Sequence, residues 1–329
     1  MISRRTLGVV CVLAGSLAAC GDRQSVLNPK GPQASELAHL GWFLFAAGTA
    51  ILLFVIVATA LAVRGSERLR ARLASDQMVV WAGVVFPVVT LTFLLSYGVW
   101  LTRATAVALD DPNAVRVSVI GEQWWWRLLY EHNGTVVAAA NEIRIPVGRS
   151  VVFKLSSPDV IHSFWVPNLG GKVDMIPGRS THLRLRADHP GVFRGQCAEY
   201  CGGPHALMAF EVVALSEPDF ESWLEAQSKP SAAPVSAQAQ RGRELFLAAG
   251  CGACHAIRGT PAAGTIGPDL THLATRRSVG LDTMPMTEAN TQRFIRDGQH
   301  IKPGNLMPPF RIFAQADLEA LAAYLAGLR

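Results

Sequence analysis

Two long apolar stretches constrain the fold of this chain more than any other feature. Residues 40–63 and residues 78–101 each run for 24 positions without a charged side chain. An α-helix rises 1.5 Å per residue, so each stretch is long enough to cross a hydrocarbon core of about 30 Å. Pro87 lies inside the second stretch and is tolerated there when neighbouring groups satisfy the carbonyl that it frees. We therefore predict a two-helix membrane hairpin at residues 39–103.

The loop between these stretches indicates which way the hairpin lies in the membrane. Residues 64–72 contain four arginines and a single acidic residue. Loops rich in Lys and Arg stay on the cytoplasmic side of a membrane. This rule places the N-terminus and everything after Arg103 on the outer, periplasmic face.

The first 19 residues have the pattern of an export signal. Arg4 and Arg5 precede a short apolar segment that is too short to be a spanning helix. The sequence Leu-Ala-Ala-Cys at residues 17–20 resembles a bacterial lipoprotein signal, which predicts cleavage before Cys20 and lipidation of its thiol. The alternative is an ordinary signal peptide with a chance cysteine behind it. Residues 20–38 then form a lipidated segment that leads into the hairpin of the bacterial inner membrane.

Residues 104–225 change to an alternation of apolar and polar side chains. The alternation is clear at residues 115–119, 143–147 and 183–185, and short apolar runs follow at residues 151–155, 192–196 and 210–215. Gly, Pro, Asn and Asp separate these runs, as they do in turns between strands. Six or more short strands without long helices predict a β-sandwich or Greek-key barrel.

The last part of the chain reads as a linker followed by a helical domain. Residues 226–240 are rich in Ala, Ser, Gln and Pro and hold one charge, which predicts a flexible linker. Residues 241–246 and 317–328 are predicted to begin and end a helical domain at residues 241–329. The net charge of +5 over 329 residues is modest and lacks the concentrated basic face of a nucleic-acid-binding protein.

The sandwich contains a group of soft metal ligands. Cys197, Cys201, His205 and Met208 place two thiols, an imidazole and a thioether within a dozen residues. Sulfur and imidazole together suit copper better than magnesium or calcium. A disulfide and a zinc site are the alternatives for such a pair of cysteines. Met208 argues against zinc, because a thioether is a weak axial ligand of copper.

The helical domain contains a motif for covalent haem attachment. In Cys251-Gly-Ala-Cys254-His255, two thioether bonds hold the porphyrin edge and the histidine faces the iron. Zinc binding and thiol redox chemistry are the alternatives. A methionine is expected on the other side of the iron, with Met284, Met286 and Met307 as candidates.

Among these candidates we favour Met307. The segment Asn-Leu-Met-Pro-Pro-Phe at residues 305–310 is similar to the distal methionine loop of class I cytochromes c. Residues 267–270, Gly-Pro-Asp-Leu, resemble the proximal loop of the same class, in which the Pro268 carbonyl would orient His255.

Taken together, these motifs carry a resemblance to one family. Residues 197–201, His205 and Met208, together with Asp-Val-Ile-His-Ser-Phe-Trp at residues 159–165, closely resemble the CuA domain of cytochrome c oxidase subunit II. With its haem domain, the chain looks like the fused subunit II of a bacterial caa3-type oxidase. The resemblance implies a cupredoxin-like Greek-key CuA domain at residues 104–225 and an all-α class I cytochrome c domain at residues 241–329.

The resemblance also implies the ligands of a binuclear copper centre. The two thiolates would bridge two copper ions, each capped by a histidine, while a methionine and a backbone carbonyl bind weakly. By position these ligands are Cys197, Cys201, His162, His205, Met208 and the carbonyl of Glu199. The Glu199 carboxylate would also bind magnesium at a subunit interface. Trp124 would be the residue at which electrons enter, although tryptophans on a strand also serve as ordinary packing.

The implied function is electron input to a haem-copper oxidase. Cytochrome c or another high-potential donor would reduce the haem c of this chain, and the electron would pass through CuA to subunit I, which holds haem a, haem a3 and CuB. Subunit III would be a further partner. Many relatives have a carboxylate at the start of the second span that feeds a proton path, whereas residues 78–101 contain no acid.

Two other functions stay open at this point. One is the electron-input subunit of a nitric oxide reductase that uses CuA, and the other is a stand-alone membrane-anchored electron carrier. Quinol-oxidase subunits share the fold but lack the copper ligands, so the full ligand set argues against them.

Overall fold

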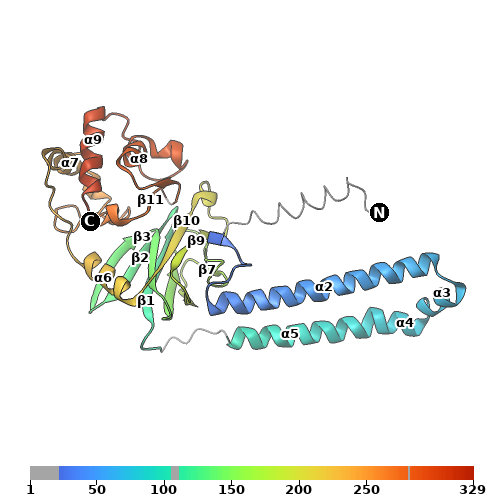
Figure 1. Ribbon diagram of the computed structural model, residues 1–329. Helices are drawn as coiled ribbons and strands as arrows, with labels where there is room; N and C mark the ends of the chain where they lie inside the picture. The colour runs from blue at the N-terminus through green and yellow to red at the C-terminus, as the bar shows by residue number, and fades with distance from the viewer. Residues whose placement is uncertain (1–21, 105–110, 281) are drawn as a thin grey trace, which may run out of the picture. The chain divides into compact units, whose positions relative to one another are not determined.

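The computed structural model describes residues 22–104, 111–280 and 282–329 of the chain (Figure 1). The predicted signal peptide and Cys20 therefore lie outside the described residues. The described chain forms two compact units, one at residues 36–108 and the other comprising the N-terminal segment up to residue 35 and everything from residue 109 onward.

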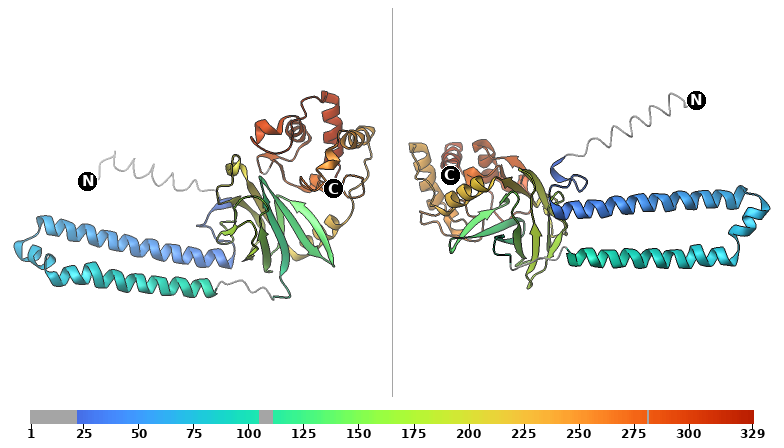
Figure 2. Two further views of the ribbon diagram at one scale, coloured as in Figure 1. Left: turned by 180° about the vertical axis from the view of Figure 1, so that it is seen from behind. Right: turned by 60° about the horizontal axis from the view of Figure 1, so that its bottom comes forward.

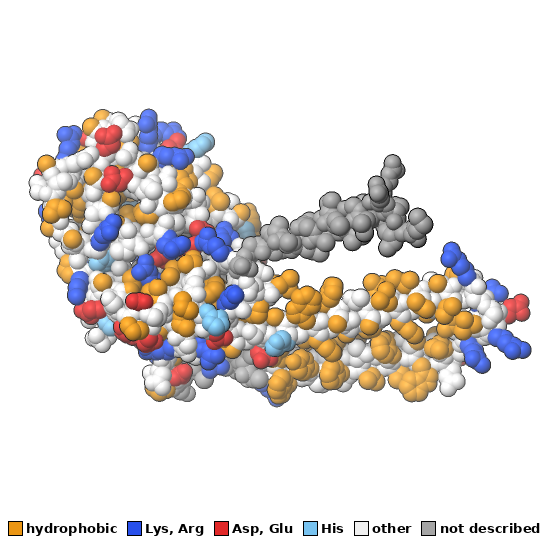
Figure 3. Space-filling view, in the orientation of Figure 1, with side chains coloured by type: hydrophobic (Ala, Val, Ile, Leu, Met, Phe, Trp, Pro, Cys, Tyr) orange, Lys and Arg blue, Asp and Glu red, His pale blue; other side chains and the backbone are white. Residues whose placement is uncertain are grey.

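The smaller unit consists almost entirely of two long helices. Helix α2 spans Pro32–Arg64 and α5 spans Phe86–Ala104, and the two run side by side in opposite directions (Figures 1 and 2). Short helices α3 (Glu67–Leu73) and α4 (Asp76–Val80) connect them. Apolar side chains cover the visible faces of both helices, and Lys and Arg gather where α3 joins them (Figure 3). Both helices are long and apolar enough to cross a membrane, which confirms the predicted pair of long apolar helices.

A π-helical turn precedes Pro87 in the second span. This turn, η2, covers Trp81–Val85 and lies directly before α5. Proline has no N–H group, and its ring clashes with the carbonyl four residues earlier. A local widening of the helix relieves this clash, so the second span continues past the proline.

The larger unit contains the predicted β-sandwich. One sheet has the order β3-β2-β1-β5-β8 and the other has the order β4-β10-β9-β6-β7. The strands are β1 (Val115–Glu122), β2 (Trp125–His132), β3 (Thr135–Ala140), β4 (Glu142–Pro146), β5 (Val151–Ser156), β6 (His162–Trp165), β7 (Val173–Met175), β8 (Thr181–Leu185), β9 (Gly191–Cys197) and β10 (Ala209–Leu215). β1 runs parallel to β5 and β4 parallel to β10, and the other pairs are antiparallel.

Alternating apolar residues from both sheets meet in one core. On β1 the side chains of Val115, Val117 and Val119 are buried, as their period-two spacing predicts. The centre of the core is aromatic, because Phe210 stacks on Phe164 with ring centroids 4.6 Å apart and meets Trp126 edge-on at 4.9 Å. These rings lie directly beneath the end of the sandwich that carries the cysteines.

A helix that the strand pattern did not predict closes the sandwich. Helix α6 spans Glu217–Ser228, and the Ser216 hydroxyl accepts a hydrogen bond from the backbone N–H of Asp219 at its N-terminus. Phe220 and Leu224 are buried on its inner face, and Trp223 contacts Tyr130 of β2. The helix has few apolar positions, so its periodicity is weak in the sequence.

The C-terminal domain is helical, as predicted. Its helices are α7 (Ala237–Ala248), α8 (Glu288–Ile301) and α9 (Gln315–Ala326), with short turns η4 (Cys251–Ala253) and η5 (Leu273–Thr275) and a small hairpin of β11 (Ser278–Val279) and β12 (Met284–Pro285). Helices α7 and α9 cross closely at Gly242, where a Cβ atom would lie 1.9 Å from the carbonyl oxygen of Ala320. Only glycine permits this approach.

The stretch between α6 and α7 is anchored on the C-terminal domain at its first residues. The carbonyl of Lys229 lies 3.0 Å from Nε2 of His272, and the N–H of Ser231 donates to the carbonyl of Arg258. Residues 229–236 thus join the sandwich to the helical domain with no helix or strand of their own.

The aromatic core predicts a large difference between two substitutions on the sandwich. Phe210→Ala removes a fully buried ring and should lower the free energy of unfolding by about 3–5 kcal/mol. Val136→Ala changes a side chain that is 62% exposed and should change the free energy by less than about 0.5 kcal/mol. Denaturant titration of the full chain in detergent measures both values, and similar losses for the two variants would contradict this account of the core.

Candidate metal centre

Three loops meet at one end of the sandwich. Residues 123 and 124 form the turn between β1 and β2, His162 begins β6, and residues 198–208 connect β9 to β10. The N–H of Ala198 donates to the carbonyl of Ser163, and the N–H of Cys197 donates to the carbonyl of Met208. These backbone bonds hold the cysteine loop against the histidine strand. Ligands that are distant in the sequence therefore share one rigid frame.

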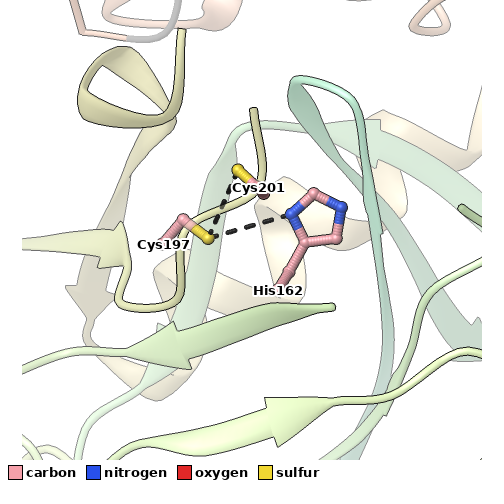
Figure 4. A group of neighbouring side chains, drawn as sticks. All are labelled: His162, Cys197 and Cys201. Carbon is pink, nitrogen blue, oxygen red and sulfur yellow. Dashed lines mark hydrogen bonds between the residues drawn. The ribbon is translucent and has the colours of Figure 1, made fainter. Parts of the chain in front are cut away.

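The sulfur and nitrogen atoms of this frame point toward one another (Figure 4). The Sγ atoms of Cys197 and Cys201 lie 3.8 Å apart, and Nδ1 of His162 lies 3.8 Å from Sγ of Cys197. On the other side, Sγ of Cys201 lies 3.5 Å from Nδ1 of His205 and 3.7 Å from Sδ of Met208. The Sγ–Sγ distance is far longer than the roughly 2.05 Å of a disulfide bond.

The site is buried as well as compact. His162, Cys197, Cys201 and Met208 are all buried, whereas His205 is half-buried on the short turn η3 (His205–Leu207). Tyr200 beside His205 is exposed, and its ring lies edge-on to the imidazole. The cluster is thus closed on the protein side and approaches the surface at His205.

The two thiols do not ionise independently. The hydrogen bond with Cys201 lowers the pKa of Cys197 to about 3, and the same interaction raises the pKa of Cys201 far above its usual range. Two thiolates this close repel each other, so both ionise together only when positive charge lies between them. Without a cation one thiol stays protonated and donates to the other, whereas a bound cation would let both sulfurs act as thiolates.

His162 is oriented by a carboxylate. Its Nε2 lies 2.9 Å from Oδ1 of Asp159, which leaves Nδ1 facing Cys197. Burial lowers the pKa of His162, but the hydrogen bonds with Cys197 and Asp159 outweigh it and the pKa is raised overall. Gly121 leaves the ring its space, since a Cβ atom there would lie 3.0 Å from Cδ2 of the imidazole. A metal-binding histidine usually donates its other ring N–H to such a carboxylate, which fixes the orientation of the imidazole.

Backbone carbonyls complete the ring of donors. The carbonyl oxygen of Glu199 lies 3.1 Å from Sγ of Cys197, while its carboxylate lies on the surface 3.7 Å from Nζ of Lys172. The carbonyl of Cys201 accepts two hydrogen bonds, from Nε2 of Gln123 at 2.8 Å and from Nε1 of Trp124 at 2.9 Å. Trp124 is therefore hydrogen-bonded to the backbone of Cys201, one of the two cysteines in the cluster.

The donor set fits copper. It offers two thiols, two imidazoles, a thioether and a backbone carbonyl at short distances from one another, and the two thiols, the thioether and one imidazole are buried. Thiolate and thioether sulfur with imidazole select copper, and the thioether of Met208 has no use in a closed zinc site. The residues that would hold the metal are His162, Cys197, Glu199, Cys201, His205 and Met208.

The C-terminal domain presents the second motif on the turn after α7. The N–H of His255 donates to the carbonyl of Cys251, which winds Cys251, Cys254 and His255 into one tight turn. Nδ1 of His255 lies 2.8 Å from the carbonyl of Pro268. A carbonyl only accepts, so Nδ1 carries the proton and Nε2 is left with its lone pair. Burial lowers the pKa of His255 and keeps the ring neutral, as an iron ligand requires.

The methionine loop is held by hydrogen bonds from its neighbours. The N–H of Met307 donates to Oδ1 of Asn305, and Nε2 of Gln299 donates to the carbonyl of Met307 at 3.1 Å. Met307 packs against the hydrophobic cluster of this domain, as does Cys251. Met286 packs against the same cluster, whereas Met284 lies on the short strand β12.

The sequence did not predict two residues that contact His162 and Trp124. Asp159 orients His162, and its place three residues earlier on a turn was the available signal. Lys302 donates a hydrogen bond to the carbonyl of Trp124 across 178 positions of sequence, and no local pattern indicates such a contact.

Comparisons with known proteins match two parts of this chain to described families. Residues 129–215 match the family described as "Cytochrome C oxidase subunit II, periplasmic domain", and residues 239–329 match the family described as "Cytochrome c". The cytochrome c oxidase subunit 2 of Alkalihalophilus pseudofirmus is 36% identical over 318 residues, covering 94% of this chain and 92% of that protein.

More distant similarities cover parts of the chain. The quinol oxidase subunit 2 of Bacillus spizizenii is 31% identical over 229 residues, covering 66% of this chain and 69% of that protein. The crystal structure of the periplasmic domain of subunit II of cytochrome oxidase (CoxB) of Bradyrhizobium japonicum is 32% identical, with a TM-score of 0.34, and the match covers 36% of this chain and 96% of that one.

The carboxylate behind His162 predicts a specific loss of copper affinity. Asp159→Ala removes the acceptor that orients the imidazole and should weaken copper binding by about 10- to 100-fold. Asp188→Ala, at a surface ion pair with Arg186, is the matched control and should leave the affinity unchanged. Titration of the full chain against a competing copper chelator measures both, and an equal effect of the two substitutions would rule out an orienting role for Asp159.

Proposed function

The chain belongs to the cytochrome c oxidase subunit 2 family, and we propose that it is the electron-input subunit of a caa3-type haem-copper oxidase. Cytochrome c or another high-potential donor reduces its haem c, and the electron passes through a binuclear CuA centre to subunit I, with haem a, haem a3 and CuB, in a complex that includes subunit III. Oxygen is reduced to water in that partner, with proton translocation.

One observation carries this proposal. Two buried thiols that ionise together only around a cation lie among two imidazoles, a thioether and a carbonyl, in a chain that also has a haem-attachment motif. A copper pair held by both thiolates would share one electron over two metals, which would keep the rearrangement on electron transfer small. The β6 and β9 frame supports this role, because it holds the ligands at fixed distances.

The protein residues around each group have distinct tasks. His255 offers the lone pair of Nε2 to iron because its Nδ1–H donates to the Pro268 carbonyl, and we assign the opposite side to Met307. Trp124 is proposed as the entry point to the copper site, since its indole N–H donates to the Cys201 carbonyl. The Glu199 carboxylate is proposed to bind magnesium at the interface with the partner, where a cation would replace the ammonium of Lys172.

The charges around the anchor support one orientation of the chain in the membrane. The chain is membrane-anchored through α2 and α5, and we propose that the arginines around α3 lie in the cytoplasm. Both metal-binding domains are then periplasmic, where copper insertion and covalent haem attachment take place. A lipid on Cys20 would add a further anchor on the same side.

Electron spin resonance on the full chain tests the copper assignment. The oxidised protein should give a signal split by two equivalent copper nuclei. Cys197→Ser should abolish this signal and leave the haem spectrum intact, whereas Cys251→Ser should impair haem attachment and leave the copper signal intact. A signal from a single copper nucleus in the native chain, or loss of both signals in either variant, would refute the assignment.

Haem spectroscopy tests the choice of methionine. Met307→Ala should remove the methionine–iron absorption and lower the reduction potential of the haem, because thioether ligation favours the reduced iron. Met284→Ala and Met286→Ala are the controls and should keep both properties. If either control loses the absorption while Met307→Ala keeps it, the axial ligand is that other methionine.

A further inference from the structure

We propose that residues 22–31, which we call the N-terminal strap, position the strands that carry the metal ligands. The strap crosses the outer face of the second sheet and ties β10, β9 and β6 together. The inference rests on the proposed function in one respect, namely that the site between these strands holds copper. The strap itself stands on contacts between residues that are 140 to 188 positions apart in the sequence.

The two strands that meet at the metal centre share a short ladder. His162 begins β6 and Cys197 ends β9. The strands pair at Phe164 with Cys197 and, one step further, at Trp165 with Gln196, where β6 ends. Register decides which face of a sheet each side chain occupies. A ladder of this length therefore gains from any further contact that ties the two strands together.

The strap supplies such a contact at the end of the ladder. Its first turn, η1 (Asp22–Gln24), lies beside β9 (Figure 1). Nε2 of Gln24 donates to Oε1 of Gln196 at 2.6 Å, and Oε1 of Gln24 accepts from Nη1 of Arg194 at 2.7 Å. Both partners belong to β9, and Gln196 directly precedes Cys197. The Gln24 amide is thus bonded at both of its ends, which fixes the strap on this strand.

The next part of the strap holds the loop that follows β6. Asn168 lies in this loop and is fully buried. Its Nδ2 donates to the carbonyls of Ser25 and Asn28, at 3.1 and 2.9 Å. The N–H of Lys30 donates in turn to the Asn168 carbonyl at 2.7 Å. Three backbone groups of the strap therefore fix the chain where it leaves β6.

The beginning of the strap secures β10. Glu211 of this strand lies opposite Arg194 of β9, so both side chains are on the outer face of the sheet. Glu211 is nevertheless only 3% exposed, and its carboxylate pairs with Arg23 of the strap and with Arg277. A carboxylate buried to this degree is costly unless cations meet it. Arg23 therefore binds firmly to the strand that follows Met208.

The order of these contacts matches the order of the strands. Along the strap the contacts meet β10, then β9 and then the loop after β6, and the sheet has the same order β10-β9-β6. A segment that only led the chain into α2 would need no contact across three strands. The close approach of Gly31, whose Cβ would lie 2.0 Å from the carbonyl oxygen of Arg186, already fixes where that helix begins.

Hydrogen–deuterium exchange on the haem- and copper-loaded full chain in detergent tests the strap. Gln24→Ala removes both hydrogen bonds to β9, and exchange at residues 162–168 and 194–198 should rise about tenfold. Residues 151–155 of the first sheet should keep their exchange rate, because the bonds of Gln24 are to the second sheet. Gln238→Ala, the same change at an exposed position of α7, is the control and should leave all three segments unchanged.

Copper release to a chelator supplies a measurement that a merely structural segment would not alter. Gln24→Ala should release copper about tenfold faster than the native chain, because the strands that carry the ligands separate more often. Gln24→Glu should restore slow release. Its carboxylate still accepts from Arg194, and the Gln196 amide can turn its N–H groups toward it.

Three results would overturn the proposal. One is unchanged exchange at residues 162–168 and 194–198 in Gln24→Ala and also in the double variant with Arg23→Ala. A second is an equal rise of exchange in both sheets, which would make the strap a source of general stability. A third is native copper release in Gln24→Ala although exchange at residues 162–168 has risen.

The same exchange measurement on the copper-free full chain separates this inference from the proposed function. If residues 162–168 and 194–198 respond to Gln24→Ala there, while the native chain takes up no copper pair, the hold of the strap on the strands stands and the copper assignment is wrong. If the native chain gives the signal of two copper nuclei and exchange does not respond, the proposed function stands and this inference fails.

Discussion

The antiparallel pairing of β6 with β9 is the interaction on which the metal centre depends. It sets Phe164 opposite Cys197, so the histidine strand and the cysteine strand share one register. Phe164 in turn stacks on Phe210, which fixes this register from below through the aromatic core. A slip of one residue would turn Cys197 away from His162 and place its neighbours toward the core.

Much of this arrangement was predictable from local patterns. The spans followed from uninterrupted apolar length, and the strands at β1, β4 and β5 followed from alternation or short apolar runs. Cys197, Cys201, His205 and Met208 occur within one short loop, so their proximity needed no knowledge of the fold. The haem-attachment motif is likewise contiguous. Membership of the oxidase subunit II family confirms the predicted fold class and its enzymatic context.

What the sequence did not reveal depends on contacts between distant segments. His162 came only from resemblance, because 35 positions separate it from Cys197 and sheet pairing brings them together. Glu122 pairs with Arg127, which reaches the carbonyl of Thr265 far along the chain, and no local pattern indicates this contact. Helix α6 was missed because its buried face holds few apolar residues. Each of these features is set by tertiary packing, which local propensity does not encode.

Because Lys302 donates to the carbonyl of Trp124, the tethered C-terminal domain occupies the surface around this tryptophan. A tether of residues 229–236 keeps the helical domain at an effective concentration of about millimolar or more near the sandwich. A freely diffusing carrier competing for Trp124 would have to exceed that concentration at similar affinity. Under the proposed function, an external donor would meet the outer surface of the C-terminal domain, and a change of donor would leave the step between haem and copper unaltered.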